Sequence, residues 1–286
     1  TAYLMARLFE LHDKSRFEVY AFSFGPNQED EMRERLIRSF DCFYTVRNKI
    51  DQEVARRSRE LGIDIAIDLK GYTGSHRAGI FAERCAPIQV NYLGYPGTMG
   101  AEFIDYIIAD DTLIPPELEQ HYTEKVIRLP DSYQPNDRQR VIANYTPTRA
   151  ELGLPEDAFV FCCFNNNYKI LPETFDSWIR ILNAVEGSVL WLLQGNPIAA
   201  KNLRKEAEAR GFDSKLLIFA KRAPLAEHLA RHQQADLFLD TFPCNAHTTA
   251  SDALWAGLPV LTHMGQSFAS RVAASLLRAA DLPELV

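Results

Sequence analysis

Residues 240–257 carry the side chains of this chain that are best suited to hold a phosphate. A short apolar run precedes them and predicts a buried strand, and His247, Thr248 and Thr249 follow in a polar turn. A helix is predicted to begin at these threonines and to stop at Gly257, because glycine commonly ends helices. Free backbone N–H groups, two hydroxyls and an imidazole at a helix N-terminus together favour a bound phosphate.

Asp252 lies one turn further along this predicted helix, where its carboxylate could accept a hydrogen bond from a sugar hydroxyl. The alternative interpretation of the segment is an ordinary helix cap, since threonine caps many helices that bind no ligand. The segment alone leaves both interpretations open.

Composition narrows the class of protein. The chain has 286 residues, 47% of them hydrophobic and 24% charged, which is typical of a globular protein with a substantial core. Its net charge of −7 argues against a nucleic-acid partner. No apolar run approaches the roughly 20 residues of a membrane-spanning helix. The five cysteines show no Cys-x-x-Cys spacing, and the adjacent Cys162 and Cys163 indicate core packing, so we expect a reducing, cytoplasmic location.

Strands and helices alternate along the chain. Strands are predicted at residues 17–24, 42–46, 63–69, 90–93, 106–109, 126–129, 159–164, 189–193, 216–219, 237–239 and 260–261, and helices at 3–11, 29–40, 52–61, 172–185, 199–210, 225–234, 249–256 and 269–279. This alternation predicts an α/β fold with doubly wound parallel sheets. A polar stretch rich in proline predicts domains at 1–140 and 159–286 with a linker at 141–158. The chain opens without Met and stops without a finishing element, so we expect a fragment of a longer protein with both domains incomplete.

Four polar clusters follow the predicted strands of the second half, at residues 165–169, 194–197, 221–228 and 240–249. Ligands of open α/β sheets lie beyond the carboxyl ends of the strands, so Lys169 and His247 are predicted to converge on one diphosphate. His228 could stack its flat ring on a base. The plainer alternatives are a surface lysine and a half-buried helix histidine.

Two loops of the first half, at residues 71–77 and 91–98, contain glycine or proline and could bring backbone close to a ligand across a cleft. Ordinary turns are the alternative. The pairs Asp110–Asp111 and Asp64/Asp68 lack a third ligand at a suitable spacing, so no metal site is predicted. Neither a dinucleotide fingerprint nor a nucleophile elbow is present.

Seven segments of the chain carry a more specific pattern: residues 93–98 (Leu-Gly-Tyr-Pro-Gly-Thr), 106–110, 164–169, 189–193, 240–249, 252–257 and 269–275. In this order they resemble the catalytic region of O-linked N-acetylglucosamine transferases and the related SPINDLY-type proteins. The resemblance implies a GT-B fold, in which two Rossmann-like domains face a cleft and the second holds most of the sugar nucleotide. It implies inverting, metal-independent transfer of N-acetylglucosamine from UDP-N-acetylglucosamine to serine or threonine hydroxyls of proteins, without a cofactor. Tetratricopeptide repeats are expected in the full-length chain.

The resemblance also implies roles for individual residues. By this resemblance the diphosphate is bound by Lys169, His247, Thr248 and Thr249, of which the first two are expected to be catalytic. The ribose is bound by Asp252. The base is contacted by Asn166, Ala223, His228 and Arg231. The sugar is approached by Leu93, Gly94 and Pro96, and Arg77 matches an arginine near the active site.

The chain departs from the family pattern at two positions. Asn166 replaces a glutamine beside the base, and Leu225 replaces a frequent lysine. GDP-fucose and UDP-glucose therefore stay open as donors, as do an inactive sugar-nucleotide binding module and an epimerase of the same architecture. The family carries an aspartate and a histidine just before the position of Thr1, so we expect this segment alone to catalyse poorly.

Overall fold

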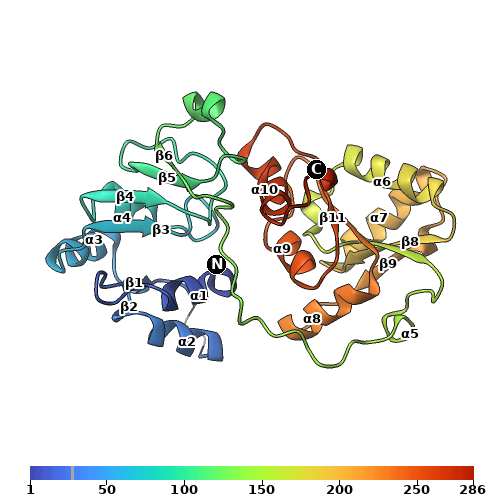
Figure 1. Ribbon diagram of the computed structural model, residues 1–286, viewed down its shortest axis with the longest axis horizontal. Helices are drawn as coiled ribbons and strands as arrows, with labels where there is room; N and C mark the ends of the chain where they lie inside the picture. The colour runs from blue at the N-terminus through green and yellow to red at the C-terminus, as the bar shows by residue number, and fades with distance from the viewer. Residues whose placement is uncertain (27–28) are drawn as a thin grey trace. The chain divides into compact units, whose positions relative to one another are not determined.

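The computed structural model describes residues 1–26 and 29–286, which divide into two units, Thr1–Arg140 and Val141–Val286 (Figure 1). All the strand pairs in the described part of the chain are parallel. Helices separate most successive strands, as crossover connections between parallel strands require. The predicted α/β class is confirmed.

The first unit contains two separate sheets. Strands β1 (Tyr20–Ser23) and β2 (Cys42–Thr45) form one sheet, and the other has the order β3 (Ile65–Asp68), β4 (Ile88–Asn91), β5 (Tyr106–Ala109) and β6 (Lys125–Arg128). The helices are α1 (Ala2–Glu10), α2 (Glu31–Ser39), α3 (Asp51–Glu60) and α4 (Ala78–Ala82). No helix was expected at α4, because five residues are too few to show a helical period.

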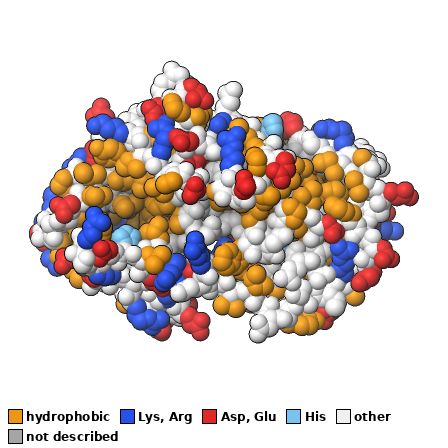
Figure 2. All heavy atoms as spheres, viewed as in Figure 1, with side chains coloured by type: hydrophobic (Ala, Val, Ile, Leu, Met, Phe, Trp, Pro, Cys, Tyr) orange, Lys and Arg blue, Asp and Glu red, His pale blue; other side chains and the backbone are white. Residues whose placement is uncertain are grey.

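An apolar groove of about 520 Å³ in the first unit is bordered by residues of both β1 and β3. Ile65 and Ile67 of β3 are about half exposed, although the strands of parallel sheets usually have both faces covered. Figure 2 shows hydrophobic side chains gathered on the face of this unit.

The second unit is a five-stranded sheet in the order β11-β10-β7-β8-β9. Its strands are β7 (Phe159–Cys163), β8 (Ser188–Leu193), β9 (Leu217–Ala220), β10 (Leu237–Leu239) and β11 (Val260–Leu261). Its helices are α5 (Arg149–Leu152), α6 (Pro172–Ala184), α7 (Pro197–Ala209), α8 (Leu225–Arg231), α9 (Thr248–Trp255) and α10 (Val272–Ala279). The chain enters at β7, builds outward to β9, and then returns to the other side of β7. The order of the strands therefore reverses between β7 and β10.

The core of the second unit forms around β8. All six of its residues are buried, including Trp191 at 0% exposure, as the near-continuous apolar run of a central parallel strand predicts. Helix α6 buries Phe175, Trp178 and Leu182 from one face against this core. Burial of each such large side chain stabilises the fold by about 1.5–3 kcal/mol.

Residues 141–158, expected as a linker, lie in the second unit. Leu154 and Ala158 are buried in its core, and the backbone N–H of Ala143 donates to the carbonyl of Ala226. A capping box begins α5, in which Thr148 and Glu151 satisfy each other's backbone N–H groups. Buried apolar residues thus anchor a stretch whose prolines and polar residues are typical of a loop.

Candidate nucleotide-binding site

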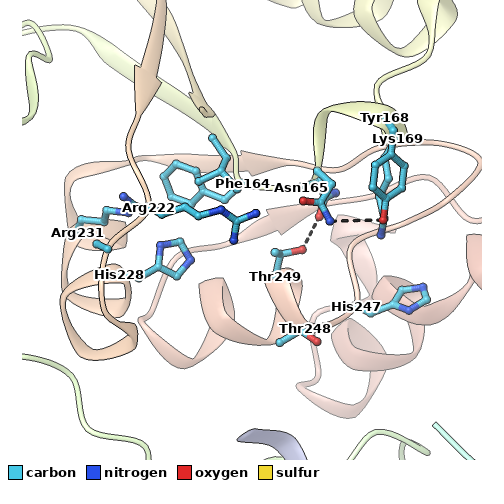
Figure 3. Close-up of a pocket in the computed structure, with 13 residues that line it drawn as sticks. Phe164, Asn165, Tyr168, Lys169, Arg222, His228, Arg231, His247, Thr248 and Thr249 are labelled. Carbon is cyan, nitrogen blue, oxygen red and sulfur yellow. Dashed lines mark hydrogen bonds between the residues drawn. The ribbon is translucent and has the colours of Figure 1, made fainter. Parts of the chain in front are cut away.

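A pocket of about 480 Å³ opens at the reversal point between β7 and β10 (Figure 3). Its walls come from the β7–α6 connection, the end of β8, the β9–α8 connection with α8, and the start of α9. In open α/β sheets the carboxyl ends of strands splay apart where the order reverses, which leaves a crevice for a ligand. The pocket has this position.

Lys169 ends a short 3-10 turn, Asn167–Lys169, that follows β7. Its Nζ donates to the carbonyl oxygen of Asn245 at 2.7 Å, in the loop that follows β10. The side chain of Asn167 holds the same turn from the other side, donating to Leu193 O and accepting from the N–H of Gly195, both at 3.2 Å. The ammonium group is therefore fixed on the wall of the pocket.

His247 occupies the N-cap position of α9, and its carbonyl accepts the first intrahelical bond, from the N–H of Ser251. The N–H groups in the first turn of α9 have no intrahelical partner, as at any helix start. Burial, helped by the positive charge of Lys169, lowers the pKa of His247 to about 4. The imidazole is thus neutral at pH 7, and a bound anion would raise its pKa.

Asn165 and Asp240 hold the two sides of the pocket together. The amide of Asn165 donates to Thr241 Oγ1 at 2.8 Å and to Asp240, and its oxygen accepts from Thr249 Oγ1. Asp240 also accepts from the N–H of Ala246 at 2.6 Å, which folds the loop back toward α9. Burial raises the pKa of Asp240 to about 6.

The far end of the pocket is flat and mostly aromatic. The His228 ring lies 5.3 Å from the Phe164 ring, and the Arg231 guanidinium lies 4.6 Å above Phe164. Arg231 donates to the carbonyl of Lys221 at 2.6 Å and is 4% exposed. Burial lowers the pKa of Arg231 to about 10, which leaves it charged, and that of His228 to about 3, which leaves it neutral. A neutral imidazole beside an aromatic ring offers a surface on which a nucleobase can stack.

The charge of the pocket opposes that of the whole chain. Lys169, Arg222 and Arg231 line it, and none of the described residues in its walls is an aspartate or a glutamate. The helix start adds further partial positive charge. A chain with a net charge of −7 thereby presents a local site for an anion.

The structure brings eight of the predicted site residues into this one pocket: Asn166, Lys169, Ala223, His228, Arg231, His247, Thr248 and Thr249. Asp252 is not in its walls. It is 6% exposed on α9, one turn beyond the threonines, and faces the interior of the unit. The contact of Asp252 with a ribose hydroxyl stays a prediction.

The remaining predicted residues, Leu93, Gly94, Pro96 and Arg77, lie in the first unit. All the donors of Arg77 face nearby groups of its own unit. Its Nε donates to Asp51 at 2.7 Å, and its terminal nitrogens donate to the carbonyls of Val46 and Lys49. In this structure Arg77 therefore joins the end of β2 to the start of α3.

The loop after β4 needs glycine for a steric reason. A Cβ on Gly94 would lie 2.0 Å from the carbonyl oxygen of Leu69, so only glycine lets this loop pass the end of β3. The preceding Leu93 has φ of 66°, a left-handed conformation that is uncommon outside glycine. The amide of Asn91 donates to the carbonyl of Gly97 at 3.0 Å and closes the loop.

Sequence reasoning missed five residues of the pocket: Phe164, Asn165, Tyr168, Leu193 and Arg222. Phe164 and Asn165 directly follow β7 and Leu193 ends β8, so the rule that ligands lie at strand ends could have found them. Asn165, Tyr168 and Arg222 were parts of recognised polar clusters but received no role, and nothing in the local pattern separates Arg222 from Lys221.

No group of three or more His, Cys, Asp or Glu in the described part of the chain is arranged to hold a metal ion. No helix among these residues has the length and apolarity that crossing a bilayer requires.

Two α/β units with parallel sheets, one of which has a cationic pocket at its strand-order reversal, are the architecture of the GT-B fold. The structure matches a solved mutant of the Thermobaculum terrenum O-GlcNAc transferase with a TM-score of 0.91 and 36% identity, covering 99% of this chain and 54% of that one. The model of glycosyl transferase family 41 matches residues 1–146 and 142–286, and the chain belongs to this family.

Curated relatives agree with this assignment. The chain is 39% identical, over 98% of its length, to a probable UDP-N-acetylglucosamine–peptide N-acetylglucosaminyltransferase SEC of Arabidopsis thaliana. It is 30% identical, over its whole length, to the UDP-N-acetylglucosamine–peptide N-acetylglucosaminyltransferase of Caenorhabditis elegans. The matches cover 29% and 35% of these two proteins, so the chain spans about a third of the length of these relatives.

Proposed function

We propose that this chain is the catalytic core of a protein O-linked N-acetylglucosamine transferase, with UDP-N-acetylglucosamine as donor and serine or threonine hydroxyls of proteins as acceptors. The observation that carries the proposal is the pocket itself. Lys169, His247 and the first turn of α9 line the same pocket, and none of the described residues in its walls carries a carboxylate. A diphosphate suits these donors, and a base suits the flat end beside His228.

The proposed reaction is a direct displacement at the anomeric carbon. The acceptor hydroxyl oxygen forms a bond to that carbon as the bond to the diphosphate oxygen breaks, and the configuration inverts. The hydroxyl proton passes to water or to the departing diphosphate. Negative charge grows on the departing diphosphate, and donors already in place stabilise it without reorganisation. Lys169, the hydroxyl of Thr248 and the N–H groups in the first turn of α9 are such donors, whereas the hydroxyl of Thr249 already donates to Asn165.

We propose further that the transfer needs no metal ion. A lysine, a helix N-terminus and hydroxyl donors supply the positive potential that a divalent cation supplies in other nucleotide-sugar enzymes. Transfer by the full-length protein is expected to continue in the presence of a chelator. Loss of transfer with EDTA and recovery with Mg²⁺ or Mn²⁺ would contradict this part of the proposal.

A donor panel tests the substrate. We expect UDP-N-acetylglucosamine to raise the melting temperature of the protein more than UDP-glucose or GDP-fucose, and the full-length protein to transfer the sugar to a serine-containing peptide. Preferential stabilisation by GDP-fucose would make GDP-fucose the proposed donor instead. The shorter amide of Asn166 and the apolar Leu225 keep this alternative open. Donor binding without transfer would indicate a binding module.

A further inference from the structure

Arg222 is the third cation that lines the pocket, beside Lys169 and Arg231. It lies in the connection between β9 and α8, and its side chain is exposed at the pocket. Among the residues that the structure describes, no ion pair or hydrogen bond engages its guanidinium. Figure 3 shows the side chain extending toward Thr249, over the start of α9.

The other two cations of the pocket are already engaged. Lys169 donates to Asn245 O, and Arg231 donates to Lys221 O while its guanidinium stacks on Phe164. These contacts position the two side chains, but they also use part of their donor capacity. Arg222 keeps a planar fork of five N–H donors for whatever enters the pocket.

The chemistry of that fork favours phosphate. A guanidinium can give two parallel hydrogen bonds to a phosphate group, and this geometry distinguishes it from the point charge of a lysine. The pocket offers no internal carboxylate as a competing partner within its described walls. In Figure 3, Arg222 and Lys169 lie on opposite sides of Thr249. A diphosphate at the start of α9 would therefore meet a cation on each side.

We propose that Arg222 binds the diphosphate of the sugar nucleotide from the side opposite Lys169. Arg222 is thereby a specificity residue that makes the site select nucleoside diphosphates over the uncharged nucleoside. This inference rests on the proposed function, because it takes the ligand to be a sugar nucleotide.

The test compares Arg222→Ala with wild type and with Lys221→Ala. Lys221 is the neighbouring exposed cation, its side chain is not part of the pocket, and its replacement removes the same charge. Calorimetry measures the affinities for UDP-N-acetylglucosamine, UDP and uridine. We expect Arg222→Ala to weaken binding of both diphosphates about tenfold and to leave uridine unchanged, whereas Lys221→Ala changes none of the three. Arg222→Lys should restore part of the loss.

Salt provides an independent readout. An exposed charge is screened by added salt, so the difference between wild type and Arg222→Ala should shrink between low and high ionic strength. Equal affinity of wild type and Arg222→Ala for UDP would overturn the inference. An equal loss for UDP and uridine would also overturn it, because it would place Arg222 on the base. A wild-type protein that bound neither UDP nor GDP would instead overturn the proposed function, and the inference with it.

Discussion

The Nζ of Lys169 lies 2.7 Å from the carbonyl oxygen of Asn245, and this contact joins the two halves of the candidate site. Lys169 follows β7 and Asn245 follows β10, on either side of the point where the strand order reverses. The lysine and His247 therefore line the same pocket. Separate locations for these two side chains would have removed the physical basis of the transferase prediction.

Replacement of Lys169 by alanine should slow transfer by about 10²–10³-fold, because it removes a charged donor from the site where charge develops on the leaving group. The measurement is the turnover of UDP-N-acetylglucosamine by the full-length protein with an acceptor peptide. Lys205→Ala on the exposed surface of α7 is the control, since it removes the same charge outside the pocket. Normal turnover in Lys169→Ala would show that the lysine only connects two loops and does not take part in transfer.

The sequence predicted the elements of the second unit well because their patterns are strong. The apolar run of β8 and the helical period of α6 each gave boundaries within one residue. The same rule that ligands lie at strand ends placed Lys169 and His247 together. Short elements such as α4 carry too little pattern, and nothing local showed that β1 and β2 form a sheet apart from β3.

The parts of the site that sequence could not supply depend on tertiary contacts. Asn165 is important because Thr241 and Thr249, 76 and 84 residues away, bond to its side chain. Asp252 has the right spacing from the helix start but is buried. Arg222 lines the pocket whereas the neighbouring Lys221 does not. These properties arise from packing, so no local pattern could reveal them.

Gly195→Ala should disturb the turn that carries Lys169. A Cβ at this position would lie 2.3 Å from Asn167 Oδ1, so the amide must move and lose its two bonds. Because the displaced atom is the end of a flexible side chain, we expect a loss of about 0.5–1.5 kcal/mol in the free energy of unfolding, together with weaker donor binding. The double variant Gly195→Ala/Asn167→Ala removes the clash, so its loss should be smaller than the sum of the two single losses. Strict additivity in denaturant unfolding would show that the two residues do not interact.

The free energy of unfolding should fall as the pH is lowered from about 6.5 toward 4. His232 is 0% exposed, and burial lowers its pKa to about 4, while a histidine in the unfolded chain titrates near 6.5. Between these values the unfolded chain binds a proton that the folded chain does not. His232 therefore lowers the free energy of unfolding by about 1.4 kcal/mol for each pH unit by which the pH falls in this range. His228 and His247 act in the same direction.

Asp240 acts in the opposite direction, because burial raises its pKa to about 6 and the folded state holds the extra proton below that value. The net slope is consequently smaller than three histidines alone would give. His232→Gln should make the pH profile shallower by about one proton between pH 6.5 and 4, whatever its effect on stability at pH 7. His121→Gln, on the exposed turn Pro116–His121, is the control. An unchanged slope in His232→Gln would show that this histidine titrates alike in both states.

Two glycines in the loop after β4 of the first unit provide a matched pair. A Cβ on Gly94 would lie 2.0 Å from Leu69 O, a backbone atom that cannot rotate away, whereas a Cβ on Gly97 would meet only Tyr95 Cε1 at 3.8 Å. Gly94→Ala should therefore cost about 1–3 kcal/mol or more and raise hydrogen exchange in the loop and at the end of β3. Gly97→Ala should change stability by no more than about 0.5 kcal/mol. The loop is predicted to approach the sugar, so donor turnover in the full-length protein should fall in Gly94→Ala and not in Gly97→Ala. Equal turnover in the two variants would count against that approach.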